Sequence, residues 1–167
     1  ADRKTSYRHT VEVDLERIIR NLSSPDVTEN QAKSDLAQLK ELIRKNADEN
    51  DPSELGIFLL NSMTDLMDAA NYLGISDSDL IMRTLFKFDS FGEFWVRKQL
   101  NGVITNSEGF RTKHSSARGT SKGGLRIDNI VEFAEVSALA FMMTWKRARS
   151  RILFGGAKGG LTINPAD

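Results

Sequence analysis

Residues 94–114 read FWVRKQLNGVITNSEGFRTKH, and this stretch decides the fold. Phe94, Trp95 and Val96 before Asn101-Gly102, and Val103 and Ile104 after it, are β-branched or aromatic, the types that strands prefer. Asn-Gly is the pair that two-residue hairpin turns favour, because both positions of such a turn need a positive φ. The pattern therefore predicts a β-hairpin whose second strand runs through Phe110 to His114.

Four helices are predicted before this hairpin. Apolar residues at helical spacing or capping sequences mark them, and they are expected at residues 11–22, 29–46, 51–73 and 76–85. Asp51-Pro52-Ser53-Glu54 offers an N-cap, a proline at the first helical position and an acid three residues after the cap. Gly74 is expected to end that third helix, and Ser76 with Asp79 forms the capping box expected to start the fourth.

The sequence changes character after the hairpin. A glycine-rich polar stretch at 115–126 precedes a helix expected at 129–149, which is apolar nearly all round and so belongs in a core or an interface. A short strand at 151–154, a glycine loop at 155–160 and another strand at 161–163 are expected to follow. The fold class predicted is α/β, a mixed β-sheet flanked by helices, with a helical N-terminal segment.

Composition excludes several classes of protein. The 167 residues carry no net charge and no cysteine, so we expect no nucleic-acid partner, no disulfide and no thiolate chemistry. The two histidines show no metal-ligand spacing, and we expect no metal site. No apolar run is long enough to span a bilayer, and no signal-peptide pattern begins the chain. We expect no membrane partner and a cytoplasmic location, or the mitochondrial matrix in a eukaryote.

The hexapeptide Gly155-Gly156-Ala157-Lys158-Gly159-Gly160 carries the clearest chemical signal. Four glycines around one lysine permit close approach of the backbone to a ligand. A phosphate-binding P-loop would need Gly-Lys-Ser/Thr, and a dinucleotide fingerprint would need Gly-x-Gly-x-x-Gly, so neither fits. Taken alone, the hexapeptide could equally be a tight turn with a solvated lysine.

Two further lysines occur near glycine or at a helix end. Five short segments follow one order along the chain: Arg111-Thr112-Lys113-His114, Ala117-Arg118-Gly119, Lys122-Gly123-Gly124-Leu125-Arg126, Met143-Thr144-Trp145-Lys146 and Gly155–Gly160. Lys146 lies 24 residues after Lys122, and Lys158 another 12 residues on. This order and spacing resembles the family of dehydrogenases that act on glutamate, leucine, phenylalanine and valine. The resemblance is strong from Gly109 to Pro165 and absent from the first fifty residues.

The resemblance implies a role for five residues. Lys158 matches the family's catalytic lysine, which works at the substrate α-carbon. Lys146 matches the lysine that pairs with the α-carboxylate, and Lys122 the one that meets the side-chain carboxylate of glutamate; Gly123 and Met143 match further substrate-binding positions. Leucine-type members have an apolar residue in place of Lys122, because a buried lysine facing an alkyl group would be unpaired and costly. Lys122 therefore favours a dicarboxylic amino acid.

The resemblance also implies a reaction and a domain organisation. A glutamate dehydrogenase converts L-glutamate to 2-oxoglutarate and ammonia with NAD or NADP, and no residue of the chain distinguishes the two cofactors. We expect residues 1–50 to be a helical extension and residues 51–167 to be a substrate-binding and oligomerisation domain. The dinucleotide-binding domain is expected to be absent from this chain, so no residue of it binds the cofactor and the chain alone should be inactive. A homo-oligomer, a hexamer in this family, is also implied.

Two alternatives stay open. The first is a leucine-, phenylalanine- or valine-type dehydrogenase, against which Lys122 argues. The second is a non-catalytic oligomerisation or interaction protein derived from the family. Thr120 and Leu153 stand where the family has proline, and Ser115 where it has asparagine, which leaves room for the second alternative.

Overall fold

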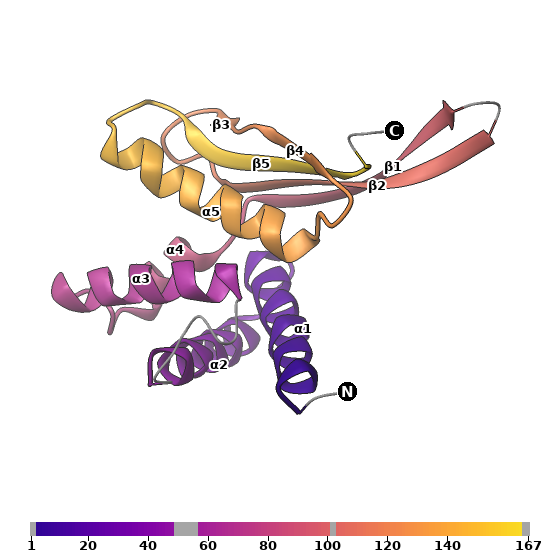
Figure 1. Ribbon diagram of the computed structural model, residues 1–167. Helices are drawn as coiled ribbons and strands as arrows, with labels where there is room; N and C mark the ends of the chain where they lie inside the picture. Colours follow the sequence, from indigo (N-terminus) through magenta and orange to yellow (C-terminus); the bar gives the residue numbers. More distant parts are fainter. Residues whose placement is uncertain (1–2, 49–56, 101–102, 165–167) are drawn as a thin grey trace. The chain divides into compact units, whose positions relative to one another are not determined.

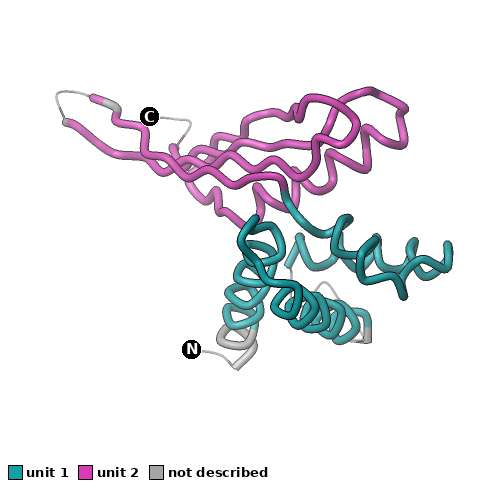
Figure 2. Tube along the Cα trace, turned by 180° about the vertical axis from the view of Figure 1, so that it is seen from behind, with its two compact units in different colours: residues 1–88 teal, residues 89–167 magenta. Residues whose placement is uncertain are grey.

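The computed structural model describes residues 3–48, 57–100 and 103–164 (Figure 1). The chain forms two compact units, residues 1–88 and residues 89–167, which Figure 2 shows in different colours. Each unit has its own core, so each is described by itself. The functional division predicted between residues 50 and 51 stays a prediction.

Two long helices, α1 (Arg3–Ser23) and α2 (Glu29–Asp48), begin the first unit (Figure 1). Residues three or four positions apart share a helix face, so the apolar residues of each helix form one buried stripe. The buried stripes consist of Val11, Leu15, Ile18, Ile19 and Leu22 on α1, and Ala32, Leu36, Leu39 and Ile43 on α2. Both predicted helices are confirmed.

The helices α3 (Phe58–Tyr72) and α4 (Asp79–Phe86) complete the first unit. The N-cap of α3 is Ile57, and the capping sequence predicted at residues 51–54 lies outside the described residues. Gly74 ends α3 as predicted: its φ is 68°, a left-handed conformation that glycine adopts without strain, and its N–H donates to the carbonyl of Asn71.

The prediction that Ser76 caps α4 is wrong. Ser78 is the N-cap, and its hydroxyl accepts a hydrogen bond from the N–H of Ile81 at 3.4 Å. A turn in which the N–H of Ser78 bonds the carbonyl of Ile75 precedes the helix. The ammonium of Lys40 on α2 donates to the carbonyl of Ser76 at 3.1 Å, which holds Ser76 in that turn before the helix begins.

The predicted hairpin forms one side of the sheet in the second unit. Strands β1 (Ser90–Leu100) and β2 (Val103–Ser115) pair antiparallel, and Leu100 lies opposite Val103. This register leaves a two-residue connection, as the sequence predicted, although Asn101-Gly102 itself lies outside the described residues. The hairpin and the extent of its second strand are confirmed.

The glycine loop predicted at residues 155–160 is wrong, because these residues belong to strand β5 (Gly155–Thr162). β5 pairs antiparallel with β2 on one side, and parallel with β3 (Ser121–Lys122) and β4 (Leu125–Asp128) on the other. The strand order is β1-β2-β5-β3, with β4 also beside β5 (Figure 1). The glycine-rich hexapeptide is therefore the central strand of a mixed sheet.

Helix α5 (Phe133–Arg149) explains why the central strand is rich in glycine. A Cβ on Gly156 would lie 2.1 Å from Oγ1 of Thr144 and 2.6 Å from the carbonyl oxygen of Ala140. A Cβ on Gly160 would lie 2.5 Å from side-chain atoms of Val131 and Val136. Only glycine permits the helix to approach the strand so closely. The helix is buried as predicted on this side, but it begins at Phe133 rather than near residue 129.

The short strand predicted at residues 151–154 is also wrong. The N–H of Arg151 bonds the carbonyl of Ala148, and the N–H of Ile152 bonds that of Arg147, so these donors complete the end of α5. Arg151 itself has a φ of 55°, which turns the chain out of the helix.

The predicted α/β class, with a mixed open sheet, flanking helices and a helical N-terminal segment, is confirmed. Among the described residues, no helix is both long enough and apolar enough to cross a membrane.

Candidate functional site

Lys158 lies in the middle of the central strand β5, with glycine on both sides at the next positions that share its face. It pairs with Thr112 of β2, whose hydroxyl lies 3.4 Å from that of Ser137 on α5. Paired residues point to the same face of a sheet, so Lys158 points to the face on which α5 packs. Its Nζ lies 3.6 Å from the position that a Cβ on Gly124 would occupy. The half-buried side chain thus reaches across the sheet toward Gly124.

Lys122 lies on the neighbouring strand β3, where it pairs with Gly156. This register also directs Lys122 to the face that carries α5, the face of Lys158. Lys122 is exposed, and its Nζ lies 5.1 Å from the centroid of the Phe154 ring. This distance is within the range of a cation–π interaction, which stabilises an ammonium group at that place.

Gly123 and Gly124 separate β3 from β4 and leave no side chain beside β5. A Cβ on Gly123 would lie 1.5 Å from the carbonyl oxygen of Ala157, so position 123 admits only glycine without a movement of the backbone. The carbonyl of Gly124 accepts a hydrogen bond from the N–H of Gly159 at 2.9 Å. Nη1 of Arg111 also donates to that carbonyl, at 3.4 Å. These contacts fix the segment that Lys158 crosses.

Met143 and Lys146 come from the last turns of α5. Met143 is half-buried and Lys146 is exposed. Thr144 between them is buried: its Oγ1 lies 2.8 Å from Nδ1 of His114 on β2, and it packs on Gly156 of β5. The end of α5 is therefore anchored to β2 and to β5, the strand that carries Lys158.

The structure thus brings the elements of the three lysines together. Lys122 and Lys158 lie on adjacent strands and face the same side, and Lys146 lies in the last turn of the helix that packs on that side. Convergence of the three ammonium groups on one ligand stays a prediction, as do the individual roles of the five predicted site residues. Among the residues that the structure describes, no group of three His, Cys, Asp or Glu side chains could hold a metal.

Two residues near these lysines were not predicted from the sequence. Phe154 was assigned to a strand, whereas its ring faces the ammonium of Lys122. Arg147 is one of several basic residues in the last turn of α5. Positive side chains are common there because they interact favourably with the helix dipole, so the sequence alone did not mark Arg147 as part of the site. Its guanidinium donates hydrogen bonds to the carbonyls of Lys122 and Gly155.

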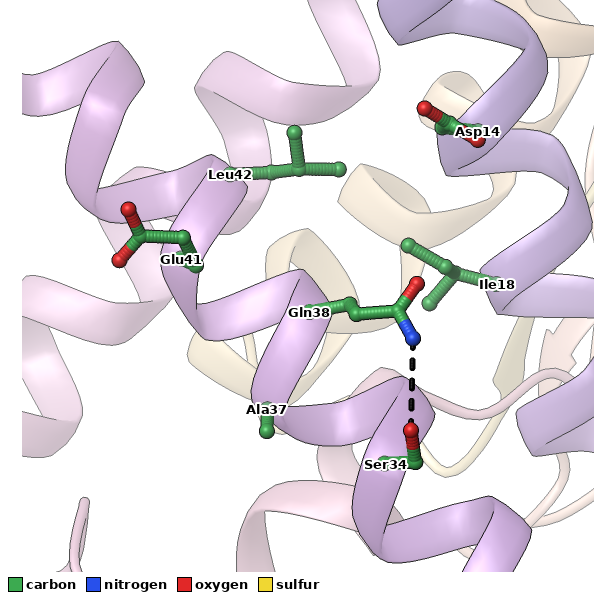
Figure 3. Close-up of a pocket in the computed structure, with 7 residues that line it drawn as sticks. All are labelled: Asp14, Ile18, Ser34, Ala37, Gln38, Glu41 and Leu42. Carbon is green, nitrogen blue, oxygen red and sulfur yellow. Dashed lines mark hydrogen bonds between the residues drawn. The ribbon is translucent and has the colours of Figure 1, made fainter.

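The first unit has an open groove of about 470 Å³ between α1 and α2 (Figure 3). Its polar groups are already bonded to neighbours: Nε2 of Gln38 donates to Oγ of Ser34 at 3.3 Å, and Asp14 and Glu41 form ion pairs on their own helices. None of the predicted site residues lines it.

Comparisons with known proteins agree with this arrangement. Residues 92–167 match the family model described as the Glu/Leu/Phe/Val dehydrogenase dimerisation domain. The glutamate dehydrogenase of Thermotoga maritima is 47% identical over 73 residues, which are 44% of this chain and 17% of that protein. The resemblance inferred from the order of the lysine and glycine segments is confirmed in this part of the chain.

Solved structures extend the likeness to the fold. Glutamate dehydrogenase from Peptoniphilus asaccharolyticus matches with a TM-score of 0.61 and 32% identity, over 66% of this chain and 28% of that one. The hetero-hexameric glutamate dehydrogenase from Thermus thermophilus matches with a TM-score of 0.58 and 27% identity, over 66% of this chain and 26% of that one. The chain therefore spans less than a third of the length of each of these three relatives.

Proposed function

We propose that the chain, whose residues 92–167 match the family model of the Glu/Leu/Phe/Val dehydrogenase dimerisation domain, forms the substrate-binding part of a glutamate dehydrogenase. The reaction is the oxidative deamination of L-glutamate to 2-oxoglutarate and ammonia, with NAD or NADP as the oxidant. The observation that carries the proposal is that Lys122 and Lys158 share one face of the sheet, beside the end of the helix that bears Lys146.

Each lysine has a task that follows from the charge of glutamate. Lys146 pairs with the α-carboxylate and Lys122 with the side-chain carboxylate, so two charge-assisted contacts orient the α-carbon. Lys158 lies at the α-carbon, where its amine accepts or donates the proton that moves as the imine is formed and hydrolysed. Gly123 and Met143 border the substrate, and because Gly123 carries no side chain it can pack directly against the backbone of β5.

The nicotinamide cofactor does not fit the described part of this chain. A dinucleotide site needs a glycine-rich turn between a strand and the N-terminus of a helix. Here the glycines at 155–160 lie within strand β5, and Gly123-Gly124 connects two short strands. We therefore propose that NAD or NADP is bound by a separate domain, and that the chain alone does not reduce the cofactor.

Substrate preference tests the proposal in the full-length enzyme. Lys122→Leu is expected to lower kcat/KM for glutamate by a factor that corresponds to roughly 2–5 kcal/mol, the range for truncating one partner of a charge pair that is buried in the complex. The kcat/KM for norvaline, which lacks the side-chain carboxylate, should rise or stay the same. In the wild type this substrate leaves the ammonium of Lys122 without a partner, and in Lys122→Leu that ammonium is gone.

A matched control is Lys113→Leu, which removes the same charge. Lys113 is exposed and pairs with Ala157, so it lies on the opposite face of the sheet from Lys122 and Lys158. This variant should keep the wild-type ratio between the two substrates. An unchanged ratio in Lys122→Leu would remove the argument for glutamate and favour a dehydrogenase for apolar amino acids.

We also propose that the chain assembles into a homo-oligomer, a hexamer by analogy with the hetero-hexameric glutamate dehydrogenase of Thermus thermophilus. Supporting this, the hairpin of the second unit exposes large apolar side chains: 42% of Phe94, 69% of Trp95 and 62% of Ile104 are accessible. Sedimentation velocity at micromolar concentration measures the oligomeric state directly. A single monomeric species would contradict the assembly without affecting the assignment of the lysines.

A further inference from the structure

Arg147 occupies a place from which it can control Lys122. It lies in the last turn of α5, and its guanidinium donates hydrogen bonds to two backbone carbonyls, those of Lys122 and Gly155. The first belongs to β3 and the second to the start of β5, strands that pair parallel at Ser121–Lys122. One planar guanidinium thus ties the helix to two neighbouring strands, because its donors have a fixed geometry.

The strand that carries Lys122 is also held on its N-terminal side, where the hydroxyl of Ser121 donates to the carbonyl of Ser115 and the N–H of Gly155 donates to the carbonyl of Thr120. β3 contains only two residues, Ser121 and Lys122, and Gly123 follows at once. A strand this short makes few ladder hydrogen bonds. The bond from Arg147 is the side-chain contact made to the carbonyl of Lys122 itself, and it therefore acts directly on the backbone of that residue.

The guanidinium of Arg147 also fixes the backbone beside Phe154, whose ring contacts the ammonium of Lys122. Phe154 immediately precedes Gly155, whose carbonyl Arg147 binds, and the ring lies 5.1 Å from Nζ of Lys122. Arg147 thus binds the backbone at Lys122 and beside Phe154, the two partners of the cation–π contact. Their relative position is therefore set by this side chain together with the pairing of β3 with β5.

We propose that Arg147 is a positioning residue that sets the place of the Lys122 ammonium and thereby the recognition of the substrate's side-chain carboxylate. This inference rests on the proposed function, in which Lys122 binds that carboxylate. Arg147 itself uses its donors on the protein backbone and acts on the substrate only through Lys122. Loss of Arg147 should therefore weaken binding of a dicarboxylic substrate and spare a substrate that lacks the second carboxylate.

Kinetics of the full-length enzyme give the first test. Arg147→Met should raise KM for glutamate roughly ten- to a hundredfold, the scale of a displacement of about 1 Å in a binding group, with kcat little changed. The kcat/KM for norvaline should stay near wild type. Both substrates have the α-carboxylate, so damage passed to the adjacent Lys146 would affect them equally and would contradict the inference. Arg149→Met is the matched control, since Arg149 lies on the same turn of α5 and is exposed.

A second readout does not depend on catalysis. Methyl groups placed on Lys122 by reductive ¹³C-methylation should resonate upfield of those on solvated lysines, because the Phe154 ring current acts on them. Phe154→Leu should remove this shift, Arg147→Met should remove it as well, and Arg149→Met should leave it. If the shift survives in Arg147→Met, the inference is wrong. If Lys122→Leu leaves the glutamate to norvaline ratio unchanged while Arg147→Met removes the shift, Arg147 positions Lys122 but the proposed function fails.

Discussion

Replacing Gly156 with alanine would place a Cβ where helix α5 meets the central strand. The new carbon would lie 2.1 Å from Oγ1 of Thr144, 2.5 Å from its backbone N and 2.6 Å from the carbonyl oxygen of Ala140. Carbon atoms in good contact lie about 3.5–4.0 Å from their neighbours, so α5 would have to retreat by roughly 1 Å at this point. Two of the three obstructing atoms belong to the helix backbone, which a rotamer change cannot move.

This displacement sets the expected cost. Overpacking by one methyl group typically destabilises a protein by about 1–3 kcal/mol, and a rigid obstacle places Gly156→Ala at the upper end. A retreat of the helix also stretches the 2.8 Å contact between Thr144 and buried His114. In a chain of this length, about 3 kcal/mol corresponds to a fall in Tm of roughly 6–12 °C.

Tryptophan fluorescence during urea unfolding measures the loss of stability in the second compact unit, which contains Gly156. The chain has two tryptophans, Trp95 on β1 and Trp145 on α5, and both lie in the second unit. Gly92→Ala is the control, because its Cβ would lie 3.5 Å from the nearest atom, the carbonyl oxygen of Arg111, which is an ordinary contact. We expect it to change stability by less than about 0.5 kcal/mol. If the two variants unfold at the same urea concentration, the close approach of α5 to Gly156 is refuted.

Further predictions concern individual side chains. Thr144→Val should lower the free energy of unfolding by about 1–3 kcal/mol in urea, because it removes a hydrogen-bond partner from the ring of buried His114. Arg44 holds the pKa of the Glu41 carboxyl below its usual value, so any resulting stability is present above the unfolded-state pKa and is lost as pH falls through the folded-state pKa. Because Glu41 is exposed, Glu41→Gln should leave Tm unchanged at neutral and acidic pH, and a clear loss at neutral pH would contradict this. In the full-length enzyme, Lys158→Ala should abolish single-turnover oxidation while calorimetry still detects glutamate binding; retained turnover would remove Lys158 from the chemistry.

The parts of the fold that the sequence predicted depend on local signals. The apolar spacing of α1 and α2 is a property of each helix alone, and so is the stop at Gly74. The hairpin followed from one residue pair between two strand-forming runs. These signals need no knowledge of what lies elsewhere in the chain, and the structure agrees with them.

The prediction for residues 155–160 failed because glycine has two uses that look alike in a sequence. It permits a flexible or tightly turning backbone, and it permits another element to pack directly on a regular strand. The atoms that exclude a side chain at Gly156 belong to residues 140 and 144, and those that exclude one at Gly160 belong to residues 131 and 136. Only the three-dimensional pairing of α5 with β5 distinguishes these uses.

The candidate site shows the same limit. The order and spacing of Lys122, Lys146 and Lys158 predicted that they belong together, but not which faces they occupy. That depends on the register, in which Thr112 pairs with Lys158 and Lys122 with Gly156. A shift of one residue would direct each lysine to the opposite face.

The glycines of this unit also determine where the ammonium of Lys158 can lie. α5 packs directly over Gly156 and Gly160, the neighbours of Lys158 on its face of the strand, so the lysine cannot extend along β5 beneath the helix. The adjacent segment carries no side chain at Gly124, and Nζ lies above that position. The side chain therefore extends sideways toward Gly124, in the segment that joins β3 to β4. The close packing that stabilises the sheet and the placement of the proposed catalytic amine thus have one physical cause.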